Sequence, residues 1–392
     1  MTAKWLKVLA AMLALCTVMT ATGCNGDKES SDSGTAEATS EVSTEEAEPL
    51  PKVGYIYHGD ADDNGFTAEI NGQRLKASQH SDIESVYIEN VTISDFETAV
   101  KTLVEYGCTH IVACHPVYTN ILTTTAGKYM NVDFIGYGSR IPTVNIFAYN
   151  EQPYQAAYVA GMAAAYNSDT EKIGIVVDPD MLYSTPIVNA AALGMQLVYT
   201  NAEMMVCYAT HDNEVEKAVN SLYNAGCDVI ICYTETARTA DYCEEKGIDF
   251  IGCMNYTETA KDYSNMLMYF YSQRDSFFLS QFKQLTLDTW EPSEFTGTLA
   301  NGVINVSQAL PAAKAGTQDI LNALIPKVST EQAYIFTGEL KNNSGNIMIM
   351  QSDLMEPSEI YTMEWYVQGV VFHDNFREPE YELDTNEFEI HS

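Results

Sequence analysis

Basic residues are scarce in this chain. Its 392 residues include 20 Lys and Arg against 54 Asp and Glu, and the formal net charge is −34. A surface that binds nucleic acid is basic, because it has to neutralise phosphates. The charge therefore argues strongly against nucleic acid as a partner, and it also disfavours direct docking on anionic lipid.

The motifs of several enzyme and cofactor classes are absent. The sequence has no GxxxxGK[ST], no GxGxxG after a strand, no GxSxG and no HExxH. None of its cysteines belongs to a CxxC pair, so neither a zinc ribbon nor a thioredoxin-like redox motif is expected. From these absences we predict a protein that is not an enzyme and that carries no cofactor and no metal.

Large apolar side chains are almost missing from residues 24–50, which cannot bury enough surface to fold and are predicted to form an acidic flexible tether. Residues 1–23 precede it and read as a targeting segment. They combine two lysines with an apolar run, Val8–Met19, that is too short to span a bilayer. Small residues directly before Cys24 are similar to a bacterial lipoprotein processing site, which would make Cys24 the lipid-carrying N-terminus. A plain secretory signal is the alternative.

An internal duplication organises the rest of the chain. ETAVKTLVEYGCTHIVACHP (Glu97–Pro116) and EKAVNSLYNAGCDVIICYTE (Glu216–Glu235) repeat at an offset of 119 residues. Each reads as an amphipathic helix that ends at Gly-Cys and leads into a short apolar strand. KVGYIYH (Lys52–His58) and KIGIVVD (Lys172–Asp178) form a second pair of similar stretches.

Strands that are apolar throughout, such as IGIVV, are buried on both faces, as in parallel sheets. Crossovers between parallel strands are right-handed by rule. We therefore predict an α/β protein of two doubly wound βαβ lobes with a hinge and a central cleft, over residues 51–371. The first lobe takes about 51–149 plus later crossover segments, and the second takes about 150–253 plus C-terminal segments. Residues 372–392 are expected to be an acidic tail.

Ligands of open α/β sheets bind at the carboxyl ends of the strands. The loop after the first strand carries Phe66, which we expect to project into the cleft and to stack on a flat ligand. The candidate ligand-binding residues at these strand ends are Asp63, Asn64, Phe66, Thr67, His115, Tyr118, Tyr183, His211, Thr234, Glu235, Asn255 and Tyr271.

Other functions of the same residues stay open. The first loop matches the start of a calcium-binding pattern, but its twelfth position is Asn71 and not the bidentate Glu that the pattern requires. The loop is also consistent with a solvated turn that caps the next helix, with Phe66 packed into the core. His58, His115 and His211 would form a metal site only if the lobes brought them into tight ligand geometry.

The order of motifs resembles the basic membrane protein family, over about residues 51–371. KVGYIYHGDADDNGFTAEINGQR (52–74) is similar to its first strand and loop, AYVAGMAAA (157–165) to a helix, and GCDVIICYTE (226–235) to a second-lobe unit. MEWYVQGV (363–370) is similar to its C-terminal end. These are lipid-anchored substrate-binding proteins of ABC importers, and the best-characterised members bind purine nucleosides or purines. The resemblance implies a type I periplasmic-binding-protein-like fold.

The resemblance also implies roles for particular residues. Phe66 would be the aromatic that stacks on the base, and Asp63 the acid before it. Thr234 and Glu235 would lie at the strand end that closes over the ligand. Nucleoside binders of the family carry an acidic pair after the strand that matches IDFIG and a Lys soon after the position of Leu267, and this chain has neither. Because those groups hold the ribose, a base alone or another small ligand stays open.

We therefore predict a lipid-anchored solute-binding protein on the outer face of the cell membrane. It would capture a purine nucleoside or base in the cleft and deliver it to an ABC permease and ATPase complex. Closure would sandwich the ligand between Phe66 and a second aromatic, Tyr183 or Tyr271. The alternatives are a binder of another small polar ligand such as a sugar, a ligand sensor for a receptor, and a secreted hydrolase, which would lack a recognisable nucleophile motif.

Overall fold

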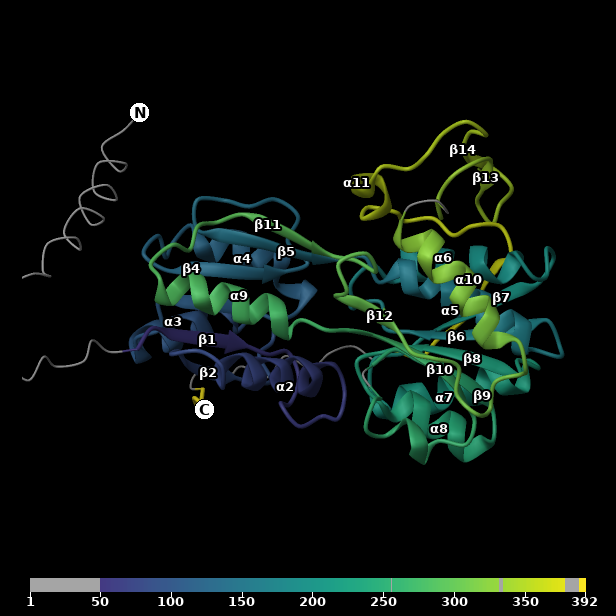
Figure 1. The fold of residues 1–392 in the computed structure, drawn as a ribbon, viewed down its shortest axis with the longest axis horizontal. Coiled ribbons are helices and arrows are strands. Elements are labelled where there is room, and N and C mark those ends of the chain that lie inside the picture. The colour runs from purple at the N-terminus through teal and green to yellow at the C-terminus, as the bar shows by residue number, and fades with distance from the viewer. Residues whose placement is uncertain (1–49, 255, 331–333, 378–387) are drawn as a thin grey trace, which may run out of the picture. The chain divides into compact units, whose positions relative to one another are not determined.

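The duplicated halves of the sequence form two sheets of parallel strands, each with helices on both faces (Figure 1). The computed structural model describes residues 50–254, 256–330, 334–377 and 388–392. The predicted α/β architecture of two doubly wound lobes is confirmed. Residues 1–23, nearly all of the tether and Cys24 lie outside the described residues. No helix within the described ranges is both long enough and apolar enough to cross a bilayer.

The first lobe is built on a six-stranded parallel sheet in the order β11-β5-β4-β3-β1-β2. Its strands are β1 (Lys52–Ile56), β2 (Glu84–Ile88), β3 (His110–Ala113), β4 (Asp133–Tyr137), β5 (Ile146–Glu151) and β11 (Glu294–Gly297). One face packs on α2 (Phe66–Ser78) and α9 (Asp275–Thr286). The other packs on α3 (Phe96–Tyr106) and α4 (Thr119–Ala126), with the short helix η1 (Pro116–Tyr118) just before α4.

The second lobe has a seven-stranded sheet in the order β12-β10-β9-β8-β6-β7-β15, in which only β12 is antiparallel to its neighbour. Its strands are β6 (Lys172–Val177), β7 (Glu203–Tyr208), β8 (Val229–Tyr233), β9 (Asp249–Gly252), β10 (Met266–Ser272), β12 (Ile304–Val306) and β15 (Val370–Asn375). Helices α5 (Tyr154–Asn167), α6 (Ser184–Gln196) and α10 (Thr317–Ser329) cover one face. Helices α7 (Asp212–Asn224) and α8 (Arg238–Lys246) cover the other, and η2 (Ala260–Asp262) follows β9.

A small subdomain is added to the second lobe after α10. It consists of the strand pair β13 (Leu340–Lys341) and β14 (Ile347–Ile349) and the short helix α11 (Pro357–Ile360). Phe336, Ile360 and Met363 from this region are buried in the core of the second lobe. Figure 1 shows the subdomain standing beside α6 and α10.

Local sequence explains the duplicated elements. Helix α3 ends at Gly107 with a φ of 103°, and Gly226, two residues after the end of α7, has a φ of 93°. Only glycine adopts this left-handed conformation without strain, so the Gly-Cys pairs end both helices as predicted. Strand β6 is buried at five of its six positions, as expected for a strand covered on both faces.

Two glycines allow α5 and α6 to pack backbone against backbone. A Cβ atom at Gly161 would lie 1.9 Å from the carbonyl oxygen of Ala191, and one at Gly194 would lie 1.9 Å from that of Tyr158. These distances leave no room for a methyl group, so any larger residue would force the helices apart. The close packing explains why the alanine-rich α5 is buried over almost its whole length.

The chain passes between the lobes where three strands end. It leaves the first lobe after β5, returns after β10 through the start of α9, and passes again from β11 to β12. All of these segments lie along the β11–β5 edge of one sheet and the β12–β10 edge of the other. This is where two lobes would hinge.

The expected boundary before the acidic tail is wrong. Strand β15 continues to Asn375 and pairs with β7, so residues 372–375 belong to the sheet of the second lobe. At the other end of the tail, Phe388 and Ile390 pack against the core of the first lobe. The acidic composition concealed an alternation of apolar side chains that is sufficient to build edge strands.

Candidate functional site

The backbones of the two lobes meet at the first loop. The amide of Phe66 donates a hydrogen bond of 2.9 Å to the carbonyl oxygen of Glu235, which follows β8 in the second lobe. A Cβ atom at Gly65 would lie 2.1 Å from the same oxygen. Gly65 is therefore required for this contact, and the structure shows the lobes closed on each other at this point.

Three titratable side chains join the lobes beside that contact. The Glu235 carboxylate forms an ion pair with Nε2 of His115, and its second oxygen lies 3.6 Å from Nδ1 of His58. The two imidazole rings stack with their centroids 4.7 Å apart. Burial alone would raise the pKa of Glu235, but His115 and His58 outweigh it and hold that pKa well below its usual value. The carboxylate is thus kept ionised between the lobes.

A fourth titratable group, Asp178, lies directly after β6. Its Oδ1 accepts hydrogen bonds from the Asp180 amide at 2.9 Å and the Thr210 hydroxyl at 3.3 Å. Burial, followed by repulsion from Glu235, raises the pKa of Asp178 far above its usual range. Burial and the neighbouring Glu235 carboxylate thus both favour the neutral form of Asp178.

The geometry of His115 argues against a metal at this cluster. His58, His115 and Glu235 offer ligand atoms within 4.8 Å of one another. However, Nδ1 of His115 accepts the amide hydrogen of Val117 at 3.3 Å, so in the neutral ring the proton is on Nε2, the atom nearest to Glu235. That tautomer offers no lone pair to a cation. His211, the third histidine considered for a metal site, is exposed at the start of α7.

A buried arginine holds the crossover segments together. Arg274, just before α9, donates from Nε and Nη2 to the two oxygens of Glu151 at 2.7 and 3.0 Å, and from Nη1 to Glu69 at 2.8 Å. Glu151 also accepts from the hydroxyls of Tyr137 and Tyr149. The guanidinium lies 5.4 Å from the ring centre of Phe66 and 5.3 Å from that of Tyr137, within cation–π range.

A cavity adjoins this cluster on the side of the second lobe. Its volume is about 30 Å³, and its lining includes Phe66, Glu69, Tyr137, Glu151, Met181, Tyr233, Met254, Phe270, Tyr271, Ser272 and Arg274. This is room for about two water molecules and not for an organic ligand. A groove of about 710 Å³ shares Glu69, Met254 and Tyr271 with the cavity and runs between α2 and residues 256–263. A larger ligand would enter only if the lobes parted.

Some of the predicted site residues do line this interlobe space. Phe66 and Tyr271 line the cavity, Asn64 lines the groove, and Glu235 with His115 forms the contact between the lobes. Phe66 is only 9% exposed in the closed structure, where it lines the cavity and also packs with the core of the first lobe. The ring is held edge-on to His115 and Tyr137, which fixes its orientation.

Two predicted residues of the first lobe serve its own loops. Asp63 accepts the amide hydrogens of Gly65 at 2.7 Å and Ala68 at 3.0 Å, so this acid shapes the first loop and caps α2. Thr67, also predicted as a ligand residue, is buried in the first turn of α2.

Four other predicted residues do not face the cavity. Tyr118 is buried and donates to the carbonyl of Val91. Tyr183 donates to Asn150 at 2.7 Å and stacks on Tyr361 beside the crossover after β5. The Thr234 hydroxyl contacts Thr236 and Thr239 within its own loop, and the ring of the exposed His211 lies at the start of α7. The hydroxyl groups of Tyr118, Tyr183 and Thr234 thus have hydrogen-bond partners away from the cavity. Asn255 lies outside the described residues.

The sequence did not point to the central charged residues. Glu69, Glu151 and Arg274 are far apart along the chain and belong to no motif. Only Glu151 had a local signal, because it is an acidic residue at the end of a strand that is buried at all six positions. A buried carboxylate needs a buried partner, so such an acid predicts a nearby cation or hydrogen-bond donor. Tyr137 closes β4 and was not among the candidate ligand-binding residues.

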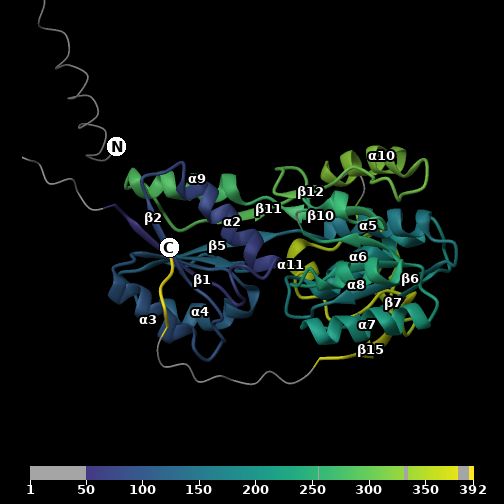
Figure 2. The same ribbon diagram turned by 90° about the horizontal axis from the view of Figure 1, so that it is seen from below.

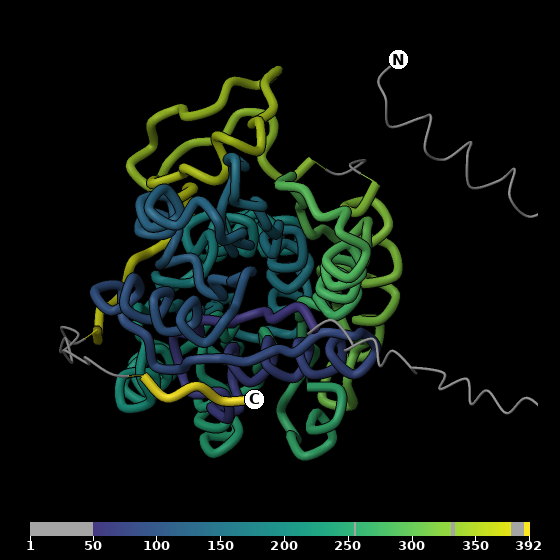
Figure 3. The backbone as a smooth tube through the Cα atoms, turned by 90° about the vertical axis from the view of Figure 1, so that its left-hand side faces the viewer, coloured from purple at the N-terminus to yellow at the C-terminus, as the bar shows by residue number. Residues whose placement is uncertain are grey.

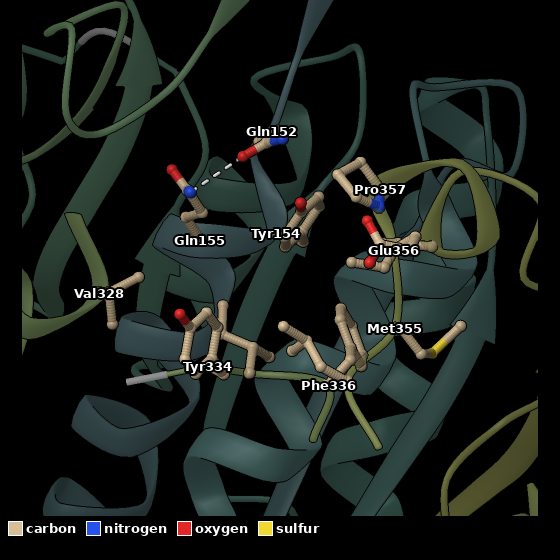
Figure 4. Close-up of a pocket in the computed structure, with 12 residues that line it drawn as sticks. Gln152, Tyr154, Gln155, Val328, Tyr334, Phe336, Met355, Glu356 and Pro357 are labelled. Atoms are coloured by element: carbon tan, nitrogen blue, oxygen red, sulfur yellow. Dashed lines mark hydrogen bonds between the residues drawn. The ribbon is translucent and has the colours of Figure 1, made fainter. Parts of the chain in front are cut away.

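A further pocket of about 270 Å³ lies between α5 and the small subdomain (Figure 4). Tyr154, Phe336 and Met355 supply its apolar walls, and Gln152 and Gln155 form part of its rim, joined by a hydrogen bond of 2.9 Å. It is separate from the interlobe cavity, because the two linings share no residue.

Comparison with known proteins identifies the family. The profile of the family described as ABC transporter substrate-binding protein PnrA-like (Bmp) matches residues 50–252. The chain belongs to this family. The resemblance inferred from the order of motifs is thereby confirmed, and the chain is a substrate-binding protein of the ABC transporter class.

Individual relatives of this PnrA-like protein are distant. It is 22% identical over 334 residues to a purine-binding protein of Brucella abortus. The matched region covers 83% of this chain and 94% of that protein. It is also 22% identical over 361 residues to a putative ABC transporter glucose-binding protein of Haloferax volcanii, with coverage of 89% and 87%. A solved ABC transporter solute-binding protein of Aeropyrum pernix shares the fold with a TM-score of 0.63 at 12% identity, over 74% of this chain and 93% of that one.

The buried arginine gives a direct test of the site's architecture. We expect Arg274→Met to lower the free energy of unfolding by about 3–5 kcal/mol, because it leaves Glu151 and Glu69 buried without their cation. Arg238→Met is the matched control, since Arg238 forms a largely solvent-exposed pair with Asp241 and should cost no more than about 1 kcal/mol. Urea unfolding measures both, and equal losses would contradict the role given to Arg274.

Proposed function

We propose that this PnrA-like protein captures a purine base or purine nucleoside between its lobes and hands it to an ABC permease and ATPase complex. The observation that carries the proposal is the interlobe cavity, where aromatic rings from both lobes face one space. Phe66 and Tyr137 come from the first lobe, and Tyr233, Phe270 and Tyr271 from the second. A flat heterocycle between such rings gains stacking on both faces.

The charges around the cavity support a neutral or cationic ligand. Glu69 and Glu151 bring two carboxylates, and Arg274 brings one guanidinium that both of them already bind. A ligand with a phosphate or carboxylate group would meet this surplus of negative charge in a poorly solvated space. A nucleobase has no such group and offers N–H donors that carboxylates accept.

Ligand entry requires the closed contacts to break and form again. The cavity of about 30 Å³ is too small for a purine, so the lobes part about the crossovers and close on the ligand. The Phe66–Glu235 hydrogen bond and the histidine pair on Glu235 form only when the lobes meet. Contacts of this kind stabilise the closed state, and a ligand adds to them only through its own contacts with both lobes.

Tyr271 provides the test of the ligand site. We expect adenine, guanine or their nucleosides to bind the purified protein in calorimetry, and Tyr271→Ala to weaken that binding about tenfold, because it removes one stacking face. Tyr223→Ala is the control, since Tyr223 is an exposed tyrosine on α7 of the same lobe. Binding of glucose and not of purines would reject the proposed ligand class. Unchanged purine affinity in Tyr271→Ala would reject the proposed site.

We further propose that the mature protein is held on the outer face of the membrane by a lipid on Cys24. The composition of residues 24–50 supports a tether that lets the two lobes stand off the membrane. We expect Cys24→Ser to move the protein from the membrane fraction to the soluble fraction of cells that express it. Membrane attachment that persists in Cys24→Ser would show a different anchor.

A further inference from the structure

Three side chains of α2 face the space between the lobes. Phe66, Glu69 and Gln73 are spaced three and four residues apart, so they lie along one face of the helix. Phe66 and Glu69 line the interlobe cavity, and Glu69 and Gln73 line the adjoining groove. Figure 2 shows α2 beside α9 on the first lobe, and Figure 3 shows the purple and blue elements of that lobe in front of the teal second lobe. A ring that stacks against Phe66 has Glu69 at its edge, because side chains three residues apart on a helix are neighbours.

The two carboxylates of the cavity differ in what they can still accept. Glu151 accepts five hydrogen bonds, from the hydroxyls of Tyr137, Tyr149 and Ser272 and from two nitrogens of Arg274. An ionised carboxylate has about four lone-pair sites, so the protein itself saturates this one. The Glu151 side chain is also only 1% exposed. A ligand therefore gains little from it.

Glu69 keeps acceptor capacity. Its Oε1 accepts from Nη1 of Arg274 at 2.8 Å and, more weakly, from Nε2 of Gln73 at 3.4 Å. The side chain is 10% exposed, and it lines both the cavity and the groove. With about four lone-pair sites on its two oxygens, this carboxylate can accept further N–H groups from a bound molecule. Glu69 is thus the carboxylate that a ligand between the lobes reaches.

The hydrogen-bond donors beside Glu69 are engaged within the protein. Arg274 is held by its two carboxylates. The side chain of Gln73 donates to the carbonyl of Ser272 at 2.9 Å and accepts the amide hydrogen of Arg274 at 2.9 Å. The edge of a ligand at this point meets a charged acceptor, and an edge with two adjacent N–H donors matches a carboxylate best.

We propose that Glu69 makes the cleft selective for a purine with an amino group at C2 beside N1–H, which is guanine or its nucleoside. This inference rests on the proposed capture of a purine between the lobes. The N1–H and 2-amino groups of guanine are adjacent and donate in parallel to the two oxygens of one carboxylate. Hypoxanthine has only the N1–H at this edge, and adenine turns the lone pair of N1 toward the carboxylate. The simpler alternative is that Glu69 only neutralises Arg274 and does not contact the ligand.

The wild-type protein gives the first test. We expect guanine to bind about tenfold more tightly than hypoxanthine in calorimetry, with adenine weakest, because each change removes a hydrogen bond to a charged group. Guanosine, inosine and adenosine give the same comparison if the protein takes nucleosides. Equal affinities for guanine and hypoxanthine would overturn the selectivity and leave purine capture standing. If none of these compounds binds, purine capture is rejected and this inference with it.

Glu69→Gln separates contact with the ligand from a structural role. The amide keeps one acceptor and adds a donor, a pair that matches the amino group and N1 of adenine, so we expect the ratio of guanine to adenine affinity to fall about tenfold. A role limited to Arg274 predicts that both purines lose affinity equally, and an unchanged ratio would overturn the proposal. Glu105→Gln is the control and should leave the ratio unchanged, since Glu105 is an exposed glutamate of the same lobe that pairs with Lys101.

Discussion

A single buried guanidinium fixes the geometry on which the rest of the molecule depends. Arg274 lies in the crossover from β10 to α9, and it forms an ion pair with Glu151, the residue at which the crossover after β5 begins. Glu69 of α2 forms a second ion pair with the same guanidinium. A buried charge is tolerated only when it is paired and hydrogen-bonded, and this one has both carboxylates and the Tyr137 hydroxyl around it. These contacts hold the crossover segments in one arrangement, and they lie where we propose that the lobes hinge.

The same cluster shapes the proposed ligand site. Because Arg274 lies over Phe66 and Tyr137, the aromatic wall of the first lobe is held in place before any ligand arrives. The second lobe supplies its rings from the ends of β8 and β10. Closure then requires the close approach of Gly65 to Glu235 and the histidine contacts beside it. Ligand binding and lobe closure use neighbouring groups, which is the condition for coupling the two.

The architecture was predictable from sequence, but most of the site was not. Periodic apolar patterns and the Gly-Cys helix ends are local features, and they revealed two duplicated lobes correctly. The strand-end rule located the region of the cleft, and three of its candidates, Phe66, Glu235 and Tyr271, lie at the interlobe cavity or contact. It failed for Tyr118 and Tyr183, whose partners, Val91 and Asn150, are distant in sequence. Glu151 and Arg274 were missed for the same reason, since a pair separated by more than a hundred residues leaves no local pattern.

Amide hydrogen exchange at Phe66 tests the central claim most directly. This amide bonds Glu235 of the other lobe, so its protection reports closure at the ligand site itself. We expect exchange at Phe66 and around Tyr271 to slow markedly when a purine ligand is added. Protection confined to Tyr334–Phe336, beside the separate pocket of the second lobe, with no change at Phe66 would contradict ligand capture between the lobes.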